Sequence, residues 1–275
     1  MTLQASWTDG HAARRLAPIA IAVLLATATA GCGTLQPGAT KGSTAAKSGG
    51  GDQRQTVEAW GDRYRTNPRD PAIAANYALA LRGAGQRAQA VAVLEQASIH
   101  NPANMELLGA YGRALADVGS HEQALQVLNR AHTPDRPDWR ILNAQGAVLD
   151  QLGRHQEAQR YYTTALRIVP EESSVLSNLG LSYALSRNLA EAEVTLKRAS
   201  AGRSVDPRVR QNLALEVGLR GRFEEAEAIA RADLPPDQAA ANVAYLRQMI
   251  AQQTAQQTAP PPRSQPKRMP VRPAS

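Results

Sequence analysis

Two apolar stripes at helical spacing stand out between Trp139 and Glu172. Each stripe recurs at i, i+4 and i+7, the first formed by Leu142, Gly146 and Leu149 and the second by Ala158, Tyr162 and Ala165. This spacing places the side chains of each stripe on one face of an α-helix. Gly153 separates the stripes and Pro170 follows the second, so the pattern predicts two short helices joined by a tight turn.

The same pattern recurs every 34 residues on both sides of this stretch. A small residue holds one place in every first helix: Ala78, Gly112, Gly146, Gly180 and Ala214. An alanine holds one place in every second helix: Ala90, Ala124, Ala158, Ala192 and Ala226. Small residues at these places let two helix backbones approach closely. A 34-residue period of this kind resembles the tetratricopeptide repeat (TPR), so we expect an all-α fold, a TPR superhelical solenoid of helix-turn-helix repeats.

The repeat register predicts the domain organisation. We expect a lipoprotein signal peptide at 1–31, a flexible tether at 32–52, the TPR domain at 53–252 and a disordered, Pro-rich basic tail at 253–275. Within the TPR domain we expect a half repeat at 53–69, repeats at 71–104, 105–138, 139–172, 173–206 and 207–236, and a capping helix at 237–252. Asp70-Pro71 and Asp206-Pro207 are predicted helix starts, with Asp as the N-cap.

The C-terminal end of the array departs from the repeat pattern. Arg210 takes the place that Leu142 holds in the regular repeat, and Asp233 takes the place of Ala165. Terminal repeats carry polar substitutions where they face solvent. A stripe suited to closing the array follows Asp237, which we expect to cap the last helix: Ala239, Val243, Leu246 and Ile250. The tail beyond has no acidic residue, and it is either simply solvated or makes a weak contact with an acidic partner.

The N-terminal segment has the features of an exported protein. Arg14 and Arg15 precede an apolar run, Leu16 to Ala30, that is short for a permanent membrane anchor, and Cys32 follows it closely. The sequence before this cysteine resembles the lipobox of bacterial lipoproteins, in which the cysteine is diacylated and becomes the first residue. The resemblance implies lipid attachment at Cys32 and, because Gly33 is not the retention-signal Asp, an outer-membrane location facing the periplasm. Ordinary signal cleavage after Ala30 is the alternative.

Composition and charge narrow the functional class. The formal net charge is +7, but the basic residues are scattered over helix faces and the tail, so we expect no nucleic-acid partner. The single cysteine excludes a disulfide framework. His121 and His155 are one repeat apart, roughly 10 Å, which is too far to share a metal ion. We therefore expect no enzyme activity, no cofactor, no metal site and no small-molecule substrate.

What remains is a binding surface on the first helices, which line the concave face of TPR arrays. Polar side chains recur there and are candidates for a peptide groove: Asn76, Asn143, Asn178, Asn212, Arg208, Arg210 and Gln211. An asparagine amide both donates to and accepts from an extended backbone, whatever the side chains of the peptide. The alternative is that these asparagines only join neighbouring helices.

The second half of the chain is more specific than a general repeat. Residues 175–250, above all Val209 to Leu215 and Asp233 to Ile250, resemble the TadD-type TPR lipoproteins of tight-adherence (Tad/Flp) pilus machines. The resemblance implies an outer-membrane assembly factor that binds a secretin or another machine component. A lipoprotein for type IV pilus or outer-membrane barrel assembly is the runner-up, and an adaptor that regulates cell-wall enzymes is the alternative from another class.

Overall fold

The computed structural model of the chain describes residues 45–202 and 205–258. These residues form twelve helices: α1 (Ala45–Thr66), α2 (Pro71–Gly83), α3 (Arg87–His100), α4 (Met105–Asp117), α5 (His121–Asn129), α6 (Trp139–Gln151), α7 (His155–Ile168), α8 (Ser173–Leu185), α9 (Leu189–Ser200), α10 (Pro207–Leu219), α11 (Phe223–Ala230) and α12 (Pro236–Thr258). The predicted all-α fold is confirmed. The predicted signal peptide, Cys32 and most of the predicted tether lie outside the described residues, as does most of the tail.

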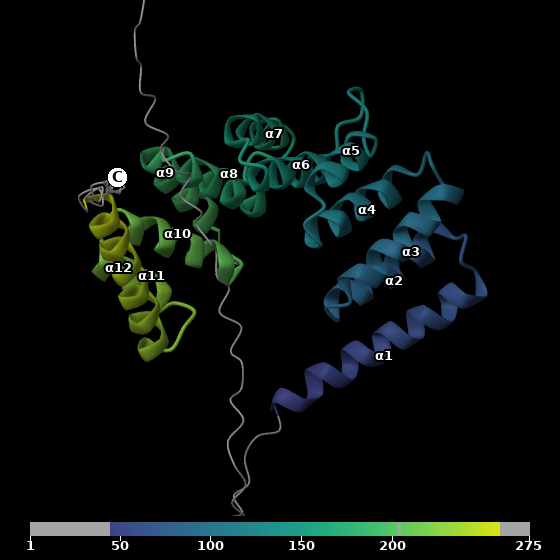
Figure 1. Cartoon of the computed structure of the whole chain (residues 1–275), viewed down its shortest axis with the longest axis horizontal. Coiled ribbons are helices and arrows are strands. Elements are labelled where there is room, and N and C mark those ends of the chain that lie inside the picture. The colour runs from purple at the N-terminus through teal and green to yellow at the C-terminus, as the bar shows by residue number, and fades with distance from the viewer. Residues whose placement is uncertain (1–44, 203–204, 259–275) are drawn as a thin grey trace, which may run out of the picture. The chain divides into compact units, whose positions relative to one another are not determined.

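Helices α2 to α11 form five consecutive helix-turn-helix pairs (Figure 1). The first helix of each pair contacts the first helix of the next, from α2 through α4, α6, α8 and α10 to α12. Among the described helices, no two second helices contact each other. The row of first helices is therefore the tightly packed, inner side of the array, and the second helices splay apart on the outer side.

Close approach within each pair explains the small residue of the first helix. A Cβ atom added to Gly146 would lie 2.5 Å from a ring carbon of Tyr162, and one added to Gly112 would lie 2.5 Å from Leu128. Both distances are well below ordinary contact, so only a hydrogen atom fits between these helices. The large residues opposite are fully buried.

The turns within the pairs require a left-handed backbone conformation. Gly153 has φ of 72°, and the same conformation recurs at Gly85, Gly119 and Gly221. Arg187, which replaces glycine in the fourth repeat, has φ of 63°. The chain thus keeps the turn geometry even where a side chain makes it unfavourable, because the packing of the flanking helices fixes the turn.

Helix starts agree with the predicted caps in two places. The Asp70 carboxylate accepts from the backbone N–H of Ala72 at 2.8 Å and of Ile73 at 3.0 Å, with Pro71 in the first turn. Asp206 caps α10 in the same way. Asp237 differs from the prediction: it lies inside the first turn of α12, which already begins at Pro236, and there a carboxylate still favours the helix dipole.

The polar substitutions of the fifth repeat pair with each other rather than face solvent separately. Arg210 donates from Nε to Asp233 Oδ2 at 2.7 Å and from a second guanidinium nitrogen to Oδ1. The Asp233 side chain is only 8% exposed. An ion pair thus takes the place that apolar residues hold in the regular repeats.

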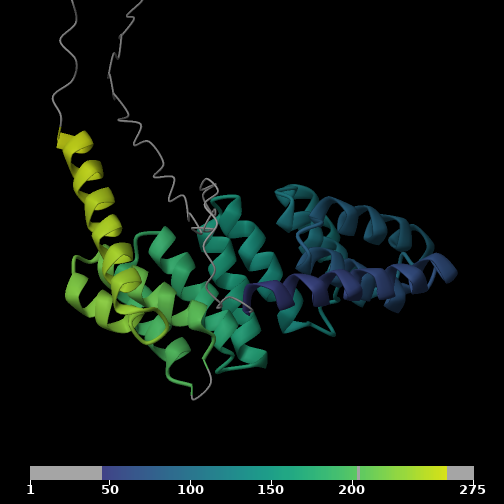
Figure 2. The ribbon, with the colours of Figure 1, turned by 90° about the horizontal axis from the view of Figure 1, so that it is seen from below.

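Two boundaries differ from the predicted ones. Helix α1 begins at Ala45, inside the region predicted as tether, and α12 continues to Thr258, inside the region predicted as tail. Figure 2 shows the end of α12 projecting beyond its neighbours, and residues 251–255 are exposed. Composition indicated loop in both places, but neither segment contains a proline, and adding residues to an established helix avoids the cost of nucleation. None of the described helices has the length and apolar character needed to cross a bilayer.

Candidate peptide-binding groove

The predicted groove asparagines form bonds along the inner row of first helices. Asn178 on α8 donates from Nδ2 to Asn143 Oδ1 on α6 at 2.9 Å, and Asn212 on α10 donates to Ser177 Oγ on α8 at 3.0 Å. Asn76 is exposed and donates to the Ala72 carbonyl of its own helix at 2.8 Å. Three of the four asparagines therefore join neighbouring first helices, as the alternative interpretation expects. Contact with a peptide stays a prediction, since each amide keeps a further donor or acceptor.

The predicted charged and polar residues of the fifth repeat lie apart from these bonds. Arg208 is exposed and pairs with Asp206 at 2.6 Å, and the Arg208 guanidinium lowers the pKa of the Asp206 carboxyl to about 2. Arg210 is held by Asp233. Gln211 is exposed, and its side chain forms no hydrogen bond with any other described residue. Of the three, Gln211 is the most available to a ligand.

A row of side chains on the same inner surface was not predicted. It consists of the residues three places after the asparagine position of each first helix: Leu79, Arg113, Ala147, Leu181 and Leu215. These residues are 34 apart and so occupy the same face of successive parallel helices. Leu79 is 62% exposed, whereas the other four are partly exposed. A second pair of leucines, Leu185 and Leu219, follows four residues later on α8 and α10 and is also partly exposed.

Asp150 joins three helices through side-chain hydrogen bonds. Its Oδ1 accepts from Ser182 Oγ at 2.7 Å and lies 2.8 Å from His155 Nδ1, and its Oδ2 accepts from the Tyr162 hydroxyl at 3.0 Å. Burial raises the pKa of the Asp150 carboxyl, and the three hydrogen bonds oppose the rise. The serine and the histidine both point to the same carboxylate, so no histidine is placed to activate the serine as a base. This cluster stabilises the junction of the third and fourth repeats.

A second charged cluster lies at the junction of the fourth and fifth repeats. Lys197, Arg222 and Arg220 all contact the Glu193 carboxylate, the first two at 2.6 and 2.7 Å. The hydrogen bonds from Lys197 and Arg222 lower the pKa of Glu193 to about 2. Glu216 is 1% exposed, and neither of its carboxylate oxygens accepts a hydrogen bond within the described part of the chain. Burial raises the pKa of Glu216, and repulsion by Glu193 adds to the rise.

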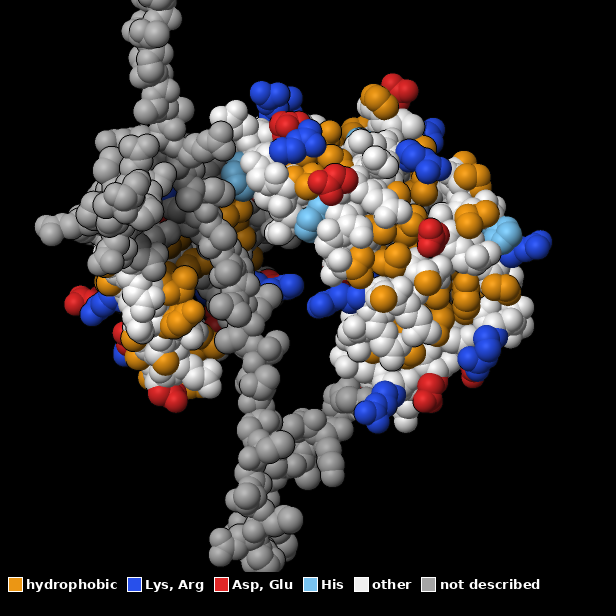
Figure 3. All heavy atoms as spheres, in the orientation of Figure 1, with side chains coloured by type: hydrophobic (Ala, Val, Ile, Leu, Met, Phe, Trp, Pro, Cys, Tyr) orange, Lys and Arg blue, Asp and Glu red, His pale blue; other side chains and the backbone are white. Residues whose placement is uncertain are grey.

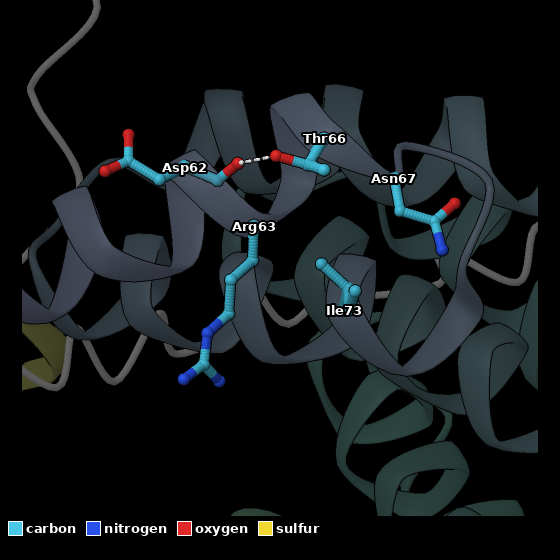
Figure 4. A pocket seen from close by; sticks show the side chains of 5 residues that line it. All are labelled: Asp62, Arg63, Thr66, Asn67 and Ile73. Atoms are coloured by element: carbon cyan, nitrogen blue, oxygen red, sulfur yellow. Dashed lines mark hydrogen bonds between the residues drawn. The ribbon is translucent and has the colours of Figure 1, made fainter.

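The remaining surface features are possible metal ligands, an open depression and the distribution of charge. In residues 45–202 and 205–258, no three His, Cys, Asp or Glu side chains are grouped so as to hold a metal ion. An open depression between α1 and α2 is lined by Asp62, Arg63, Thr66, Asn67 and Ile73 (Figure 4). Within this lining, the Thr66 hydroxyl donates from Oγ1 to the Asp62 carbonyl at 3.0 Å. On the face drawn in Figure 3, basic side chains are dispersed among acidic and apolar ones, unlike a nucleic-acid-binding surface.

Comparison with known proteins identifies the repeats. Two tetratricopeptide-repeat profiles match, one over residues 81–146 and the other over residues 139–172. The second match coincides with the stretch that defined the register. No curated protein sequence matches the chain significantly.

Solved structures share the fold at low sequence identity. PilW, described as a widely conserved type IV pilus biogenesis factor, is 18% identical with a TM-score of 0.61, covering 70% of this chain and 91% of PilW. PilF of Pseudomonas aeruginosa is 20% identical with a TM-score of 0.51, covering 66% and 81%. A thermophilic TPR protein of Thermus thermophilus is 24% identical with a TM-score of 0.57, covering 64% and 98%. The described part of the chain is a TPR solenoid.

Proposed function

We propose that the protein is a lipid-anchored scaffold on the periplasmic side of the outer membrane that assists assembly of a tight-adherence pilus machine. Its inner row of first helices would hold a segment of the secretin or of another machine component. The observation that carries this proposal is the inner row of first helices, on which α8 and α10 each present a polar amide beside partly exposed leucines. No described element of the chain covers these residues.

The lipid anchor gives the scaffold a physical advantage. Two or three acyl chains at about 0.8 kcal/mol per buried methylene hold a protein stably at a membrane. Attachment through Cys32 would raise the effective concentration of the groove near partners in the same membrane. Substituting Cys32→Ser should abolish labelling by a fatty-acid probe, and labelling that persists would argue for ordinary cleavage.

A type IV pilus assembly role is the second candidate, because PilW, whose fold this chain shares, is described as a type IV pilus biogenesis factor. The two candidates differ in the secretin that depends on the protein. Deleting the gene should remove detergent-resistant multimers of the tight-adherence secretin and leave those of a type IV pilus secretin intact. The opposite pattern would favour the second candidate.

The groove itself can be tested in the complemented deletion strain. A double variant, Asn178→Ala with Asn212→Ala, should reduce secretin multimers if the amides contact a partner. Gln126→Ala with Gln156→Ala is a matched control, since these exposed amides lie on the second helices α5 and α7. Thermal unfolding of the purified variants separates loss of binding from loss of the hydrogen bonds between helices. Wild-type multimers with the asparagine double variant would refute the assignment of these amides.

A further inference from the structure

Arg113 on α4 is a cation without a partner on the inner surface. It is partly buried, and its guanidinium forms no hydrogen bond or ion pair with any residue in 45–202 or 205–258. Its two terminal nitrogens lie over Gly109, one turn earlier on the same helix, 3.6 and 3.8 Å from where a Cβ atom would be. The same Cβ would lie 2.5 Å from Ile141 Cδ1 on α6, so Gly109 admits Ile141, and the guanidinium lies beside this contact between α4 and α6.

Charged residues of both signs lie near Arg113, but none of them pairs with it. Burial lowers the pKa of its guanidinium, and Arg82 and Arg140 lower it further, while Asp138 and Glu106 act in the opposite direction from a distance. Arg82 is already paired with Asp117 at 2.6 Å, and Arg140 stacks on the Trp139 ring at 4.5 Å. A partly desolvated guanidinium that no carboxylate contacts is stabilised when a negative group joins it.

Farther along the same row the surface becomes apolar. Leu181 and Leu215 hold the repeat position of Arg113 on α8 and α10, and Ala147 holds it on α6 between them. Leu185 and Leu219 extend this apolar area by one helical turn. Asn178 and Asn212, one turn before Leu181 and Leu215, fix α8 to α6 and α10 to α8. From α4 to α10 the row thus presents a basic residue, a small residue and then a leucine patch, on helices that hydrogen bonds hold together.

We propose that this row binds an extended segment of a partner protein that places a carboxylate at Arg113 and apolar side chains at Leu181 and Leu215. The inference rests on the proposed function, that the inner surface holds a peptide. Charge complementarity selects the acidic residue, and the unfilled leucine patch selects the apolar ones. Neighbouring first helices are about 10 Å apart, so Arg113 and Leu181 are about 20 Å apart. An extended chain covers this distance in about six residues.

The probe is a library of phage-displayed random peptides, each about three times the roughly six residues needed to span the row, selected on the full 275-residue chain in detergent micelles. Selected peptides should share an Asp or Glu about six positions from a pair of apolar residues. Fluorescence anisotropy with the best selected peptide should show binding weakened about tenfold or more by Arg113→Gln, the usual effect of losing a charge-assisted hydrogen bond. Leu181→Ser with Leu215→Ser should weaken binding as strongly.

Matched controls lie on the second helices. Arg160→Gln on α7 and Val194→Ser on α9 change exposed side chains of similar types and should leave the affinity unchanged. Arg113→Gln should not lower the melting temperature, because it removes an unpaired charge; a purely structural arginine would lower it. A peptide in which the acid is replaced by its amide should bind the wild-type protein about tenfold more weakly, and this measurement does not depend on the fold of a variant.

The experiment separates the recognition of an acid and apolar residues from the general ability of the inner surface to hold a peptide. Peptides without an acidic preference, or unchanged binding by Arg113→Gln and by the amide peptide, would overturn the two-part recognition but leave the groove. If no selected peptide bound more weakly to the variant with Leu181→Ser and Leu215→Ser, the result would count against the peptide-holding function itself.

Discussion

Replacing Gly146 with alanine should force α6 and α7 apart. The added Cβ would lie 2.5, 2.7 and 2.9 Å from three carbons of the Tyr162 ring, about 1 Å closer than ordinary carbon contacts. The ring is 1% exposed, and its hydroxyl is held by Asp150 at 3.0 Å, so it cannot move without straining that bond. Overpacking costs about 1–3 kcal/mol, the strained hydrogen bond about 1 kcal/mol, and helix propensity returns about 1 kcal/mol. The expected net loss is about 2 kcal/mol.

Urea unfolding followed by far-UV circular dichroism measures this loss. The matched control is Gly83→Ala, because a Cβ added to Gly83 meets no atom within 4 Å and the same substitution should cost nothing there. A second background, Tyr162→Ala, removes the ring, and combining it with Gly146→Ala recreates the alanine pair that Ala214 and Ala230 form in the fifth repeat. In that background Gly146→Ala should become neutral or stabilising.

The same effect of Gly146→Ala with and without the Tyr162 ring would refute the explanation by overpacking between α6 and α7. Equal effects would mean that the glycine is required by its backbone rather than by the close approach of the helices. A loss at Gly83 as large as that at Gly146 would point to the same conclusion.

Two further substitutions test the charged junctions. Glu216→Gln should stabilise the array near pH 7. Burial raises the pKa of Glu216 in the folded protein above its ordinary value of 4.5, so the wild type loses stability as the pH rises above 4.5. The advantage of glutamine over the wild type should therefore vanish below pH 4.5. A pH-independent difference in urea midpoints, or a gain equal to that of the exposed control Glu122→Gln, would contradict it. Asp233→Ala should destabilise the fifth repeat by about 1–3 kcal/mol, because it leaves the partly buried Arg210 unpaired. The double variant Arg210→Leu with Asp233→Ala should recover most of this loss, as measured by thermal unfolding of both variants. Equal stability of the two variants would contradict the pairing.

The sequence could predict the regular repeats because their requirements are local. The small residue at Gly146 and the turn at Gly153 each reflect a contact or a backbone angle within one helix pair, and these recur every 34 residues. The ends of the array were predicted less well. Helix α1 starts earlier and α12 ends later than composition indicated, because composition alone does not show where a docked helix stops.

The candidate site was predicted in part. The asparagine position was found from its recurrence, but the bonds from Asn178 and Asn212 depend on which first helices touch. The row of Arg113, Leu181 and Leu215 was missed, although the 34-residue register alone aligns these three positions. The recurrence was hidden because the residue type changes along the row.

By itself, then, the sequence determined the repeat, its register and the all-α fold, since each depends on side chains that meet within one helix pair. Only the tertiary structure decided which polar groups are satisfied. Asp150 collects three hydrogen bonds from two helices, Arg210 finds Asp233, and Glu216 and Arg113 find no partner among the described residues. The physical reason is that burial and pairing between repeats depend on how neighbouring helices are placed in space, and a 34-residue period does not specify which charges face each other across a junction.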